Sequence, residues 1–272
     1  MNELITSRSN SKVKFIRSIQ AKKSSRISGF FIVEGIHHVG EAIEAMQAGK
    51  GISVHSVYYA PELLKGDFAG KLIKTADTLG IACFPMSDYV FISVAEKENP
   101  QGILAVVERK VYPLSSLSPH NFNWGVALVA AQDAGNIGTI MRTIDAVNAD
   151  GLILLDGGAD PFHSHAVRAS MGTLFWRPVV EATFDEFREW VMQYGYHVVG
   201  TSAHARQDYR EGTPYPQPAI LLMGSEQKGL TQEQSSLCEK MVSMPMKGRA
   251  SSLNLAVATG VMLYAMLGEG EP

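Results

Sequence analysis

The feature that most restricts the fold is the run from Val126 to Ala131, in which every residue is apolar. A strand this apolar needs cover on both faces of its sheet, and parallel sheets obtain that cover from the helices that connect their strands. Short apolar runs then alternate with segments whose apolar residues recur at helical spacing. The second half of the chain therefore predicts an α/β fold, a mostly parallel sheet with helices on both sides.

The elements of this sheet follow from the same pattern. The other expected strands are Leu152–Leu155, His197–Thr201, Ala219–Met223 and Met241–Met244. The expected helices are Ile137–Val147, His165–Met171, Phe184–Tyr194, Gln232–Lys240 and Ser252–Leu267. Because ligands of open α/β sheets bind beyond the carboxyl ends of strands, the residues after each strand are the candidates for a site.

The first part of the chain predicts a second, smaller α/β domain. Its expected helices are 11–28, His37–Gln47, Phe68–Leu79 and Ser87–Val94, and its expected strands are Phe30–Val33, Val54–Tyr59, Ile81–Phe84 and Ile103–Val107. Residues 112–123 are rich in Pro, Ser and Asn and lack an apolar period, as linkers do. At 272 residues, two domains are expected, 1–115 and 116–272.

The charge of the chain is unevenly distributed. The net charge is −3, yet residues 1–33 carry seven Lys and Arg residues against Glu3 alone. A basic arm on an otherwise acidic protein can hold a polyanion locally, although a solvated helix face would produce the same pattern. The basic residues that we expect to contact RNA phosphates in this arm are Lys12, Lys14, Arg17, Lys22, Lys23 and Arg26.

Other classes of protein are disfavoured. The chain has no apolar run of about 18 residues, the length that spans a membrane, and Met1–Leu4 does not begin a signal peptide. We therefore expect a cytoplasmic protein that is not bound to a membrane. Cys83 and Cys238 have no partner at metal-ligand spacing, so we expect buried thiols and no metal site.

Three polar clusters follow apolar runs in the second half. They are Asn136–Gly138 with Arg142, Gly224–Glu226 with Gly229, and Met244–Met246 followed by Ser252–Asn254. One arginine, one glutamate and two amides among small residues suit a buried pocket for an uncharged or zwitterionic ligand. Glu226 would repel a phosphate, and the turn lacks the Lys-Ser or Lys-Thr of a phosphate loop.

Each cluster also has a purely structural interpretation. Asn136 could cap the following helix, and Ser251 or Ser252 could cap the last one. Arg142 lies in an apolar stretch, so it would need an anionic partner if it were buried, or else it forms a surface salt bridge. Glu226 could be a turn acid before a helix.

The order and spacing of the three clusters resemble the signature motifs of the SpoU (TrmH-like) family of RNA 2'-O-ribose methyltransferases, in the SPOUT superfamily. Phe31–Gly35 and Asn99–Val106 resemble the ends of that family's amino-terminal substrate-binding domain. The resemblance implies S-adenosylmethionine as cofactor, a carboxyl-terminal trefoil knot and a homodimer. It also implies that 1–115 binds RNA and that 116–272 carries the methyltransferase chemistry.

The resemblance also implies roles for individual residues. The catalytic residues would be Arg142, Asn136, Glu226, Ser252 and Asn254. The cofactor would be held by Met223, Gly224, Met244, Met246, Leu253 and Ser170. Lys247 and Arg249 would contact RNA phosphate. Leu255-Ala256 stands where the family commonly has Val-Ser, which removes one hydroxyl.

We therefore expect transfer of a methyl group to a ribose 2'-hydroxyl of ribosomal RNA. Transfer RNA is the alternative substrate. A non-catalytic RNA-binding protein of the same fold is the alternative from another class. Loss of the arginine, the glutamate or the terminal asparagine would favour that alternative, but all three residues are present. An α/β oxidoreductase is disfavoured because the dinucleotide fingerprint is missing.

Overall fold

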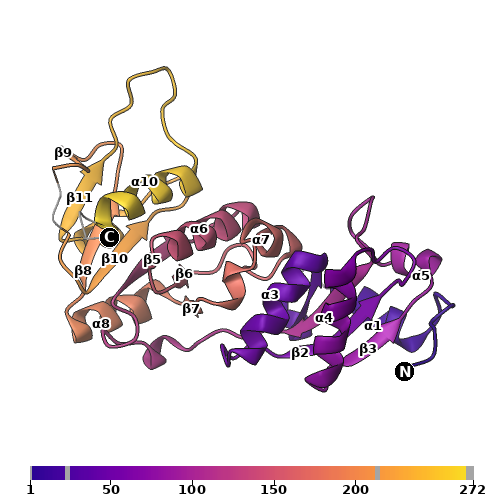
Figure 1. Cartoon of the computed structure of the whole chain (residues 1–272). Helices are drawn as coiled ribbons and strands as arrows, with labels where there is room; N and C mark the ends of the chain where they lie inside the picture. Colours follow the sequence, from indigo (N-terminus) through magenta and orange to yellow (C-terminus); the bar gives the residue numbers. More distant parts are fainter. Residues whose placement is uncertain (1, 22–24, 212–214, 268–272) are drawn as a thin grey trace. The chain divides into compact units, whose positions relative to one another are not determined.

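The structure is a computed structural model that describes residues 2–21, 25–211 and 215–267. It divides into two compact units: unit 1 comprises Met1–Lys110 with Phe162–Trp176, and unit 2 comprises Val111–Pro161 with Arg177–Pro272 (Figure 1). The domain boundary predicted from the sequence, near residue 115, placed residues 162–176 in the carboxyl-terminal domain, whereas the structure groups them with unit 1. Their membership of unit 1 has a physical cause, because the rings of Phe162 and Phe175 lie 4.8 and 6.3 Å from that of Phe31.

Unit 1 is built on a four-stranded sheet in the order β1-β4-β2-β3. Strand β4 pairs antiparallel with β1 and β2, and β2 pairs parallel with β3. The strands are β1 (Phe30–Glu34), β2 (Val54–Tyr59), β3 (Ala82–Pro85) and β4 (Ile103–Glu108). The helices are α1 (Ser11–Ala21), α2 (Ser25–Ser28), α3 (Ile36–Gln47), α4 (Asp67–Thr78), α5 (Asp88–Ile92), α7 (Ser164–Ala169) and the 3-10 turn η2 (Thr173–Phe175). The predicted helix 11–28 is thus two described helices.

Unit 2 contains a seven-stranded sheet in the order β7-β6-β5-β10-β8-β11-β9, in which every pairing is parallel. The strands are β5 (Trp124–Val129), β6 (Leu152–Leu155), β7 (Val179–Ala182), β8 (His197–Thr201), β9 (Gln207–Asp208), β10 (Ala219–Met223) and β11 (Lys240–Ser243). The predicted parallel α/β sheet is confirmed. Strands β7 and β9 were not predicted, because β7 has only two consecutive apolar residues before a glutamate and β9 has no apolar residue.

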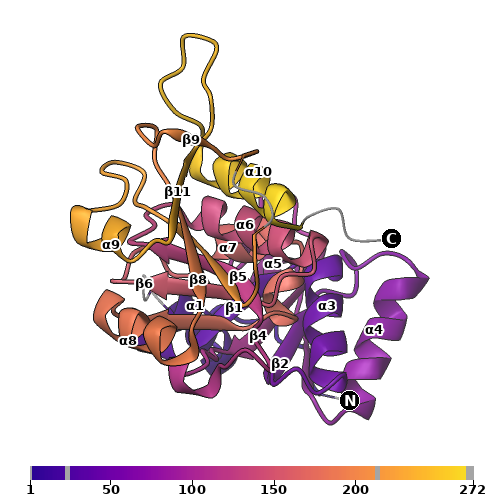
Figure 2. The same cartoon turned by 90° about the vertical axis from the view of Figure 1, so that its left-hand side faces the viewer.

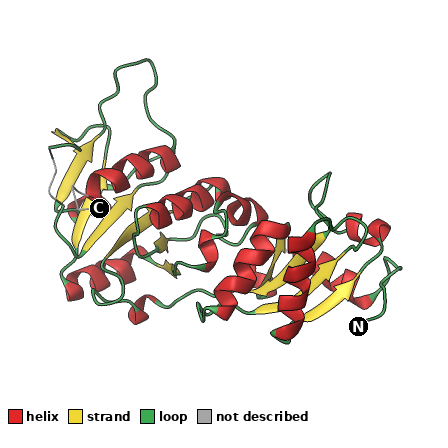
Figure 3. Ribbon diagram, viewed as in Figure 1, coloured by secondary structure: helices red, strands yellow, loops and turns green. Residues whose placement is uncertain are grey.

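Helices cover both faces of the unit 2 sheet (Figures 2 and 3). They are α6 (Ala134–Ala146), α8 (Phe184–Tyr194), α9 (Gln232–Ser236) and α10 (Leu255–Leu267), with the 3-10 turn η1 (Leu114–Ser116). Helices α6 and α10 pack together. On the other face, Phe187 and Trp190 of α8 share a core with Ala127, Ile153 and Ile220 of the strands.

The segment predicted as a linker, 112–123, is folded against unit 2, so that prediction is wrong. Leu117 and Phe122 are buried in the α8 core. The Trp190 indole N–H donates to the Leu117 carbonyl at 2.9 Å, and the Tyr112 N–H donates to Val179 at 3.0 Å. The segment is polar because it forms turns, and it packs on unit 2 through a few apolar side chains such as Leu117 and Phe122. Because these side chains follow no helical or strand period, the sequence pattern did not indicate the packing.

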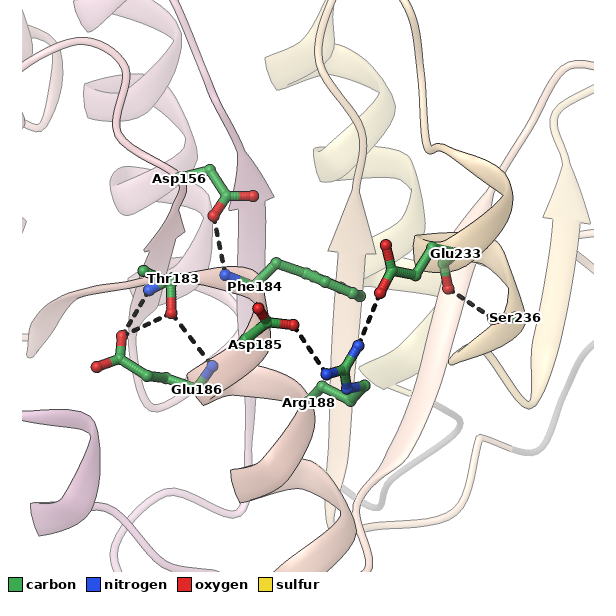
Figure 4. A network of polar contacts seen from close by, with 8 residues as sticks. All are labelled: Asp156, Thr183, Phe184, Asp185, Glu186, Arg188, Glu233 and Ser236. Carbon is green, nitrogen blue, oxygen red and sulfur yellow. Dashed lines mark hydrogen bonds and ion pairs between the residues drawn. The ribbon is translucent and has the colours of Figure 1, made fainter.

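Polar contacts hold α8 at the carboxyl edge of the sheet (Figure 4). The Asp156 carboxylate, just after β6, accepts a hydrogen bond from the Phe184 N–H at 2.9 Å. Arg188 forms ion pairs with Asp185 at 2.8 Å and with Glu233 of α9 at 2.7 Å. Because these ion pairs are partly exposed, each contributes at most about 1 kcal/mol and mainly orients α9 against α8.

Cys83 and Cys238 are free, half-buried thiols. Burial raises the pKa of Cys83 to about 11 and that of Cys238 to about 12, so both are neutral at physiological pH. Within the described ranges, no helix is both long and apolar enough to cross a membrane. The same residues include no group of three or more His, Cys, Asp or Glu side chains placed to hold a metal ion.

Candidate active site

Two of the three polar clusters meet where the strand order of unit 2 reverses. The first cluster follows β5 and the second follows β10, and these two strands are parallel neighbours. From β5 the chain adds β6 and then β7 on one side, whereas β10, β8 and β11 lie on the other. The carboxyl edge at such a switch point is where open α/β sheets bind ligands. The fold therefore places both clusters at the expected position.

One side chain from each cluster joins a chain of hydrogen bonds. The Asn254 amide donates from Nδ2 to Oδ1 of Asn136 at 3.0 Å. The Asn136 amide in turn donates from Nδ2 to Oε1 of Glu226 at 3.3 Å. The other oxygen of that carboxylate faces the Gln132 N–H at 3.4 Å. The structure thus brings together three predicted site residues from distant parts of the sequence.

The direction of this chain is set by the start of α10. Oδ1 of Asn254 accepts from the N–H groups of Ala256 at 2.9 Å and Val257 at 3.3 Å, so Asn254 is the helix cap. Its Nδ2 therefore points toward Asn136. The alternative interpretation of Ser251 or Ser252 as the cap is wrong, because the helix begins at Leu255 and those two serines precede it in an exposed segment.

Helix α6 is capped by Asp133, so the alternative interpretation of Asn136 as its cap is also wrong. The Asp133 carboxylate accepts from the N–H groups of Gly135 at 2.6 Å and Asn136 at 3.1 Å. Asn136 therefore lies in the first turn of the helix, with its side-chain amide available to Glu226 and Asn254. An aspartate just before the apolar run was the sequence signal for this cap.

Replacing Asn254 tests the cap and the chain separately. Asn254→Ala is expected to lower the free energy of unfolding by about 1 kcal/mol, the usual effect of losing a helix cap. Asn254→Asp keeps the cap acceptor but cannot donate to Asn136, so it should retain stability and lose methyl transfer. Urea unfolding and a transfer assay measure the two effects. Equal stability of Asn254→Ala and the parent would contradict the cap.

The second cluster forms a turn with no space for a side chain at Gly224. A Cβ placed there would lie 2.2 Å from the carbonyl carbon of Gly229 and 2.4 Å from the Leu230 nitrogen. Ser225 and Gly229 form a bridge, with the Gly229 N–H donating to the Ser225 carbonyl at 2.9 Å. The turn therefore folds its backbone directly over the end of β10.

Arg142 lies on the exposed side of α6. It is six residues after Asn136, about 9 Å along the helix axis. The alternative of a surface salt bridge is not found: among the described residues, no hydrogen bond or ion pair reaches the Arg142 side chain. Exposure removes the desolvation cost that would have required an anionic partner. The guanidinium is thus available to an external anion.

The predicted cofactor residues have different settings. Met223 is buried at the end of β10, and Met244 and Met246 are half-buried. Leu253 is 39% exposed. Residues 244–254 form the long segment between β11 and α10 in Figure 1, and it carries the exposed Ser252, Lys247 and Arg249.

Ser170 belongs to unit 1, whereas the other predicted cofactor residues belong to unit 2. It is fully buried, and its hydroxyl donates to the Val167 carbonyl at 2.9 Å at the end of α7.

The predicted basic arm lies in unit 1. Lys14, Arg17 and Arg26 are exposed, whereas Lys12 is half-buried beside Phe84. Lys22 and Lys23 lie outside the described residues. Arg8, one of the seven basic residues of the arm but not among the predicted phosphate contacts, stacks on an exposed tyrosine. No local pattern in the sequence could have revealed this contact, because Arg8 and Tyr89 are far apart along the chain.

Comparisons with known proteins agree with the arrangement. The SpoU rRNA Methylase family matches residues 123–264, and the MRM3-like substrate binding domain matches residues 10–105. The chain is 31% identical to a 23S rRNA (guanosine(2553)-2'-O)-methyltransferase of Bacillus subtilis, over 97% of this chain and 99% of that protein. It is 33% identical to a 23S rRNA (uridine(2479)-2'-O)-methyltransferase of Streptomyces viridochromogenes, over 96% of this chain and 90% of that protein.

A solved structure shares both units. The crystal structure of an AdoMet-bound rRNA methyltransferase from Sinorhizobium meliloti superposes with a TM-score of 0.85 at 33% identity, over 97% of each chain. The family resemblance of the sequence motifs is thereby confirmed over nearly the whole length. The protein belongs to the SpoU rRNA methylase family.

Proposed function

We propose that this protein transfers the methyl group of S-adenosylmethionine to a ribose 2'-hydroxyl of ribosomal RNA. The observation that carries the proposal is the hydrogen-bonded chain Asn254–Asn136–Glu226 at the switch point of a parallel sheet. The two curated relatives described above are both named 23S rRNA 2'-O-methyltransferases, which supports the substrate class. A ribosomal RNA substrate is consistent with the cytoplasmic residence expected from the sequence.

The residues at this edge fit the proposed cofactor. Gly224 has no space for a Cβ because the backbone of Gly229 and Leu230 packs against it, which gives the turn at the end of β10 one compact form. We assign the holding of the adenine and methionine parts to this turn and to Met223, Met244, Met246 and Leu253. When bound, S-adenosylmethionine supplies a methyl group that its positive sulfur already activates for transfer.

Arg142 is assigned to the target ribose. A guanidinium keeps its proton in proteins, so it does not serve as a free base. Instead it donates hydrogen bonds that orient the 2'-oxygen and stabilise the negative charge that develops as the hydroxyl loses its proton. Asn136, held from both sides by Asn254 and Glu226, keeps the first turn of the same helix in place. Ser252 is assigned to the reacting end as well.

The amino-terminal part, residues 1–115, is proposed as the RNA-binding domain, and 116–272 as the methyltransferase domain. The match of residues 10–105 to a substrate binding domain supports this division. Lys12, Lys14, Arg17, Lys22, Lys23 and Arg26, with Lys247 and Arg249, are the proposed phosphate contacts. The trefoil knot that the family implies stays a prediction.

The reaction is tested with the pure protein, labelled S-adenosylmethionine, and separate pools of unmodified ribosomal and transfer RNA. We expect label in ribosomal RNA as an alkali-resistant 2'-O-methyl dinucleotide. Label in transfer RNA alone would show that transfer RNA, and not ribosomal RNA, is the substrate. Cofactor binding without label in either pool would refute the proposed reaction.

A homodimer is proposed from the surface of α10. Leu255–Leu267 contains no charged residue, and a helix that is apolar all round is normally covered. Val257 and Tyr264 are nevertheless 52% and 59% exposed, and with Val261 of the same helix and Thr143 of α6 they line a groove. A second copy of this chain would cover it.

The double substitution Val257→Asp with Tyr264→Asp is expected to convert the dimer to a monomer, because it would bury two unpaired charges. Light scattering after size-exclusion chromatography measures the mass. Met192→Asp is the matched control, since Met192 is 72% exposed on α8 of the same unit and should remain dimeric. A parent protein that is monomeric at micromolar concentration would contradict the proposal.

A further inference from the structure

An exposed aromatic ring in unit 1 is covered by an arginine. Tyr89 of α5 is 61% exposed. The guanidinium carbon of Arg8 lies 3.7 Å from the centre of the Tyr89 ring, which is stacking distance. A guanidinium on a tyrosine face leaves both groups flat, adjacent and accessible. Such a pair can extend its stack with another planar group.

The main chain holds Arg8 in this position. Ile5 pairs with the segment after β3: its N–H donates to the Pro85 carbonyl at 2.9 Å, and its carbonyl accepts from the Ser87 N–H at 3.0 Å. The Arg17 guanidinium then donates to the Arg8 carbonyl at 3.4 Å and to Oγ of Ser93, just after α5, at 3.0 Å. Arg17 thus positions the stack, which exists without a ligand.

The helices α1 and α5, which hold the pair, carry a further basic side chain and an acidic one. Lys12 places its ammonium 4.4 Å from the centre of the Phe84 ring, on the strand that leads toward α5. The carboxylate of Asp88, beside Tyr89, opposes this charge. Asp88 is half-buried, and its Oδ1 is a buried atom with no hydrogen-bond partner among the described residues. Basic side chains interleaved with aromatic rings are the usual surface for single-stranded nucleic acid.

We propose that Tyr89 and Arg8 form a stacking site for an unpaired base of the substrate RNA. The base continues the column of the tyrosine ring and the guanidinium, and the charges of Arg8 and Lys12 attract the adjoining phosphates. Sequence-tolerant stacking on aromatic and arginine planes is how proteins hold bases in loops and bulges of RNA. The inference rests on the proposed function for the identity of the ligand.

The test uses the full chain and a short single-stranded oligoribonucleotide that contains one 2-aminopurine, a base whose fluorescence falls on stacking. The parent protein is expected to quench it, and the same strand in a duplex should bind more weakly. Tyr89→Ala should weaken binding by about 5-fold or more, since one stacked base contributes about 1 kcal/mol or more. Tyr89→Phe and Tyr89→Trp keep a ring and should bind within about twofold of the parent.

Phe68→Ala is the matched control, because Phe68 is 57% exposed on α4 of the same unit and has no stacked arginine among the described contacts. It should leave binding and quenching unchanged. Thermal unfolding of each variant separates a folding defect from lost stacking. Equal loss in Phe68→Ala and Tyr89→Ala, or no loss in either, would overturn the proposal.

The methyl-transfer assay separates this inference from the proposed function. Tyr89→Ala is expected to raise KM for ribosomal RNA and to leave kcat within about twofold, because the ring holds RNA and takes no part in the reaction. If Tyr89→Ala transfers methyl groups with an unchanged KM and an unchanged RNA affinity, the stacking site is refuted and the proposed function stands. If quenching depends on Tyr89 but the parent protein transfers no methyl group, the proposed function is refuted and the stacking site stands.

Discussion

Arg142→Ala is expected to reduce kcat for methyl transfer to ribosomal RNA by about 100-fold or more, the usual effect of removing a donor to a developing oxyanion. The side chain is exposed and has no hydrogen bond or ion pair with a described residue, so its loss should not change the free energy of unfolding. Single-turnover transfer and urea unfolding measure the two quantities. An active variant would remove Arg142 from the mechanism.

Arg142→Lys distinguishes geometry from charge. A lysine retains the positive charge but cannot reproduce the planar pair of donors, so we expect it to be nearly as inactive as Arg142→Ala. Arg188→Lys on α8 is the matched control, because that arginine serves the contacts between α8 and α9. It should keep activity within about twofold, as expected for an exposed ion pair.

Gly224→Ala is the second substitution with a large expected effect. Its Cβ would meet the Gly229 carbonyl carbon at 2.2 Å, and a backbone atom cannot rotate aside as a side chain would. We expect stability to fall by about 1–3 kcal/mol. We also expect S-adenosylmethionine binding to be lost, because the turn that approaches the ligand must open. Calorimetric titration with the cofactor and chemical unfolding test both results.

Gly248→Ala is the control for this substitution. Gly248 lies in the segment between β11 and α10, where an added Cβ meets no atom within 4 Å and φ is not positive. Stability and cofactor affinity should stay at the parent values. Normal cofactor binding by a folded Gly224→Ala protein would exclude the turn from the cofactor site.

The sequence predicted strands that are apolar throughout better than strands with few apolar residues. The strands β5, β6, β8 and β10 were predicted within two residues of their observed ends, because their apolar runs reflect burial on both faces. Strands β7 and β9 at the sheet edges were missed. The helix predicted for Gln232–Lys240 ends at Ser236, since the last residues join or precede β11.

Caps and exposure were the weaker predictions at the candidate site. Several polar residues near a helix start can each serve as a cap, and Asp133 and Asn254 do so where Asn136 and Ser251 or Ser252 were the alternative structural interpretations. Arg142 lies among apolar residues in sequence, yet it projects from the uncovered side of α6. Which side of a helix is covered depends on its neighbours in space, and local spacing does not contain that information.

The sequence alone determined the helices of the parallel sheet, most of its strands and the three groups of polar residues after apolar runs, because burial and hydrogen bonding leave a local period. Only the tertiary structure decided which of these residues meet. Asn136 and Asn254 are 118 positions apart and share a hydrogen bond because α10 packs on α6, while Glu226 reaches Asn136 because β10 pairs with β5. Strand order is a property of long-range packing, which no local pattern encodes.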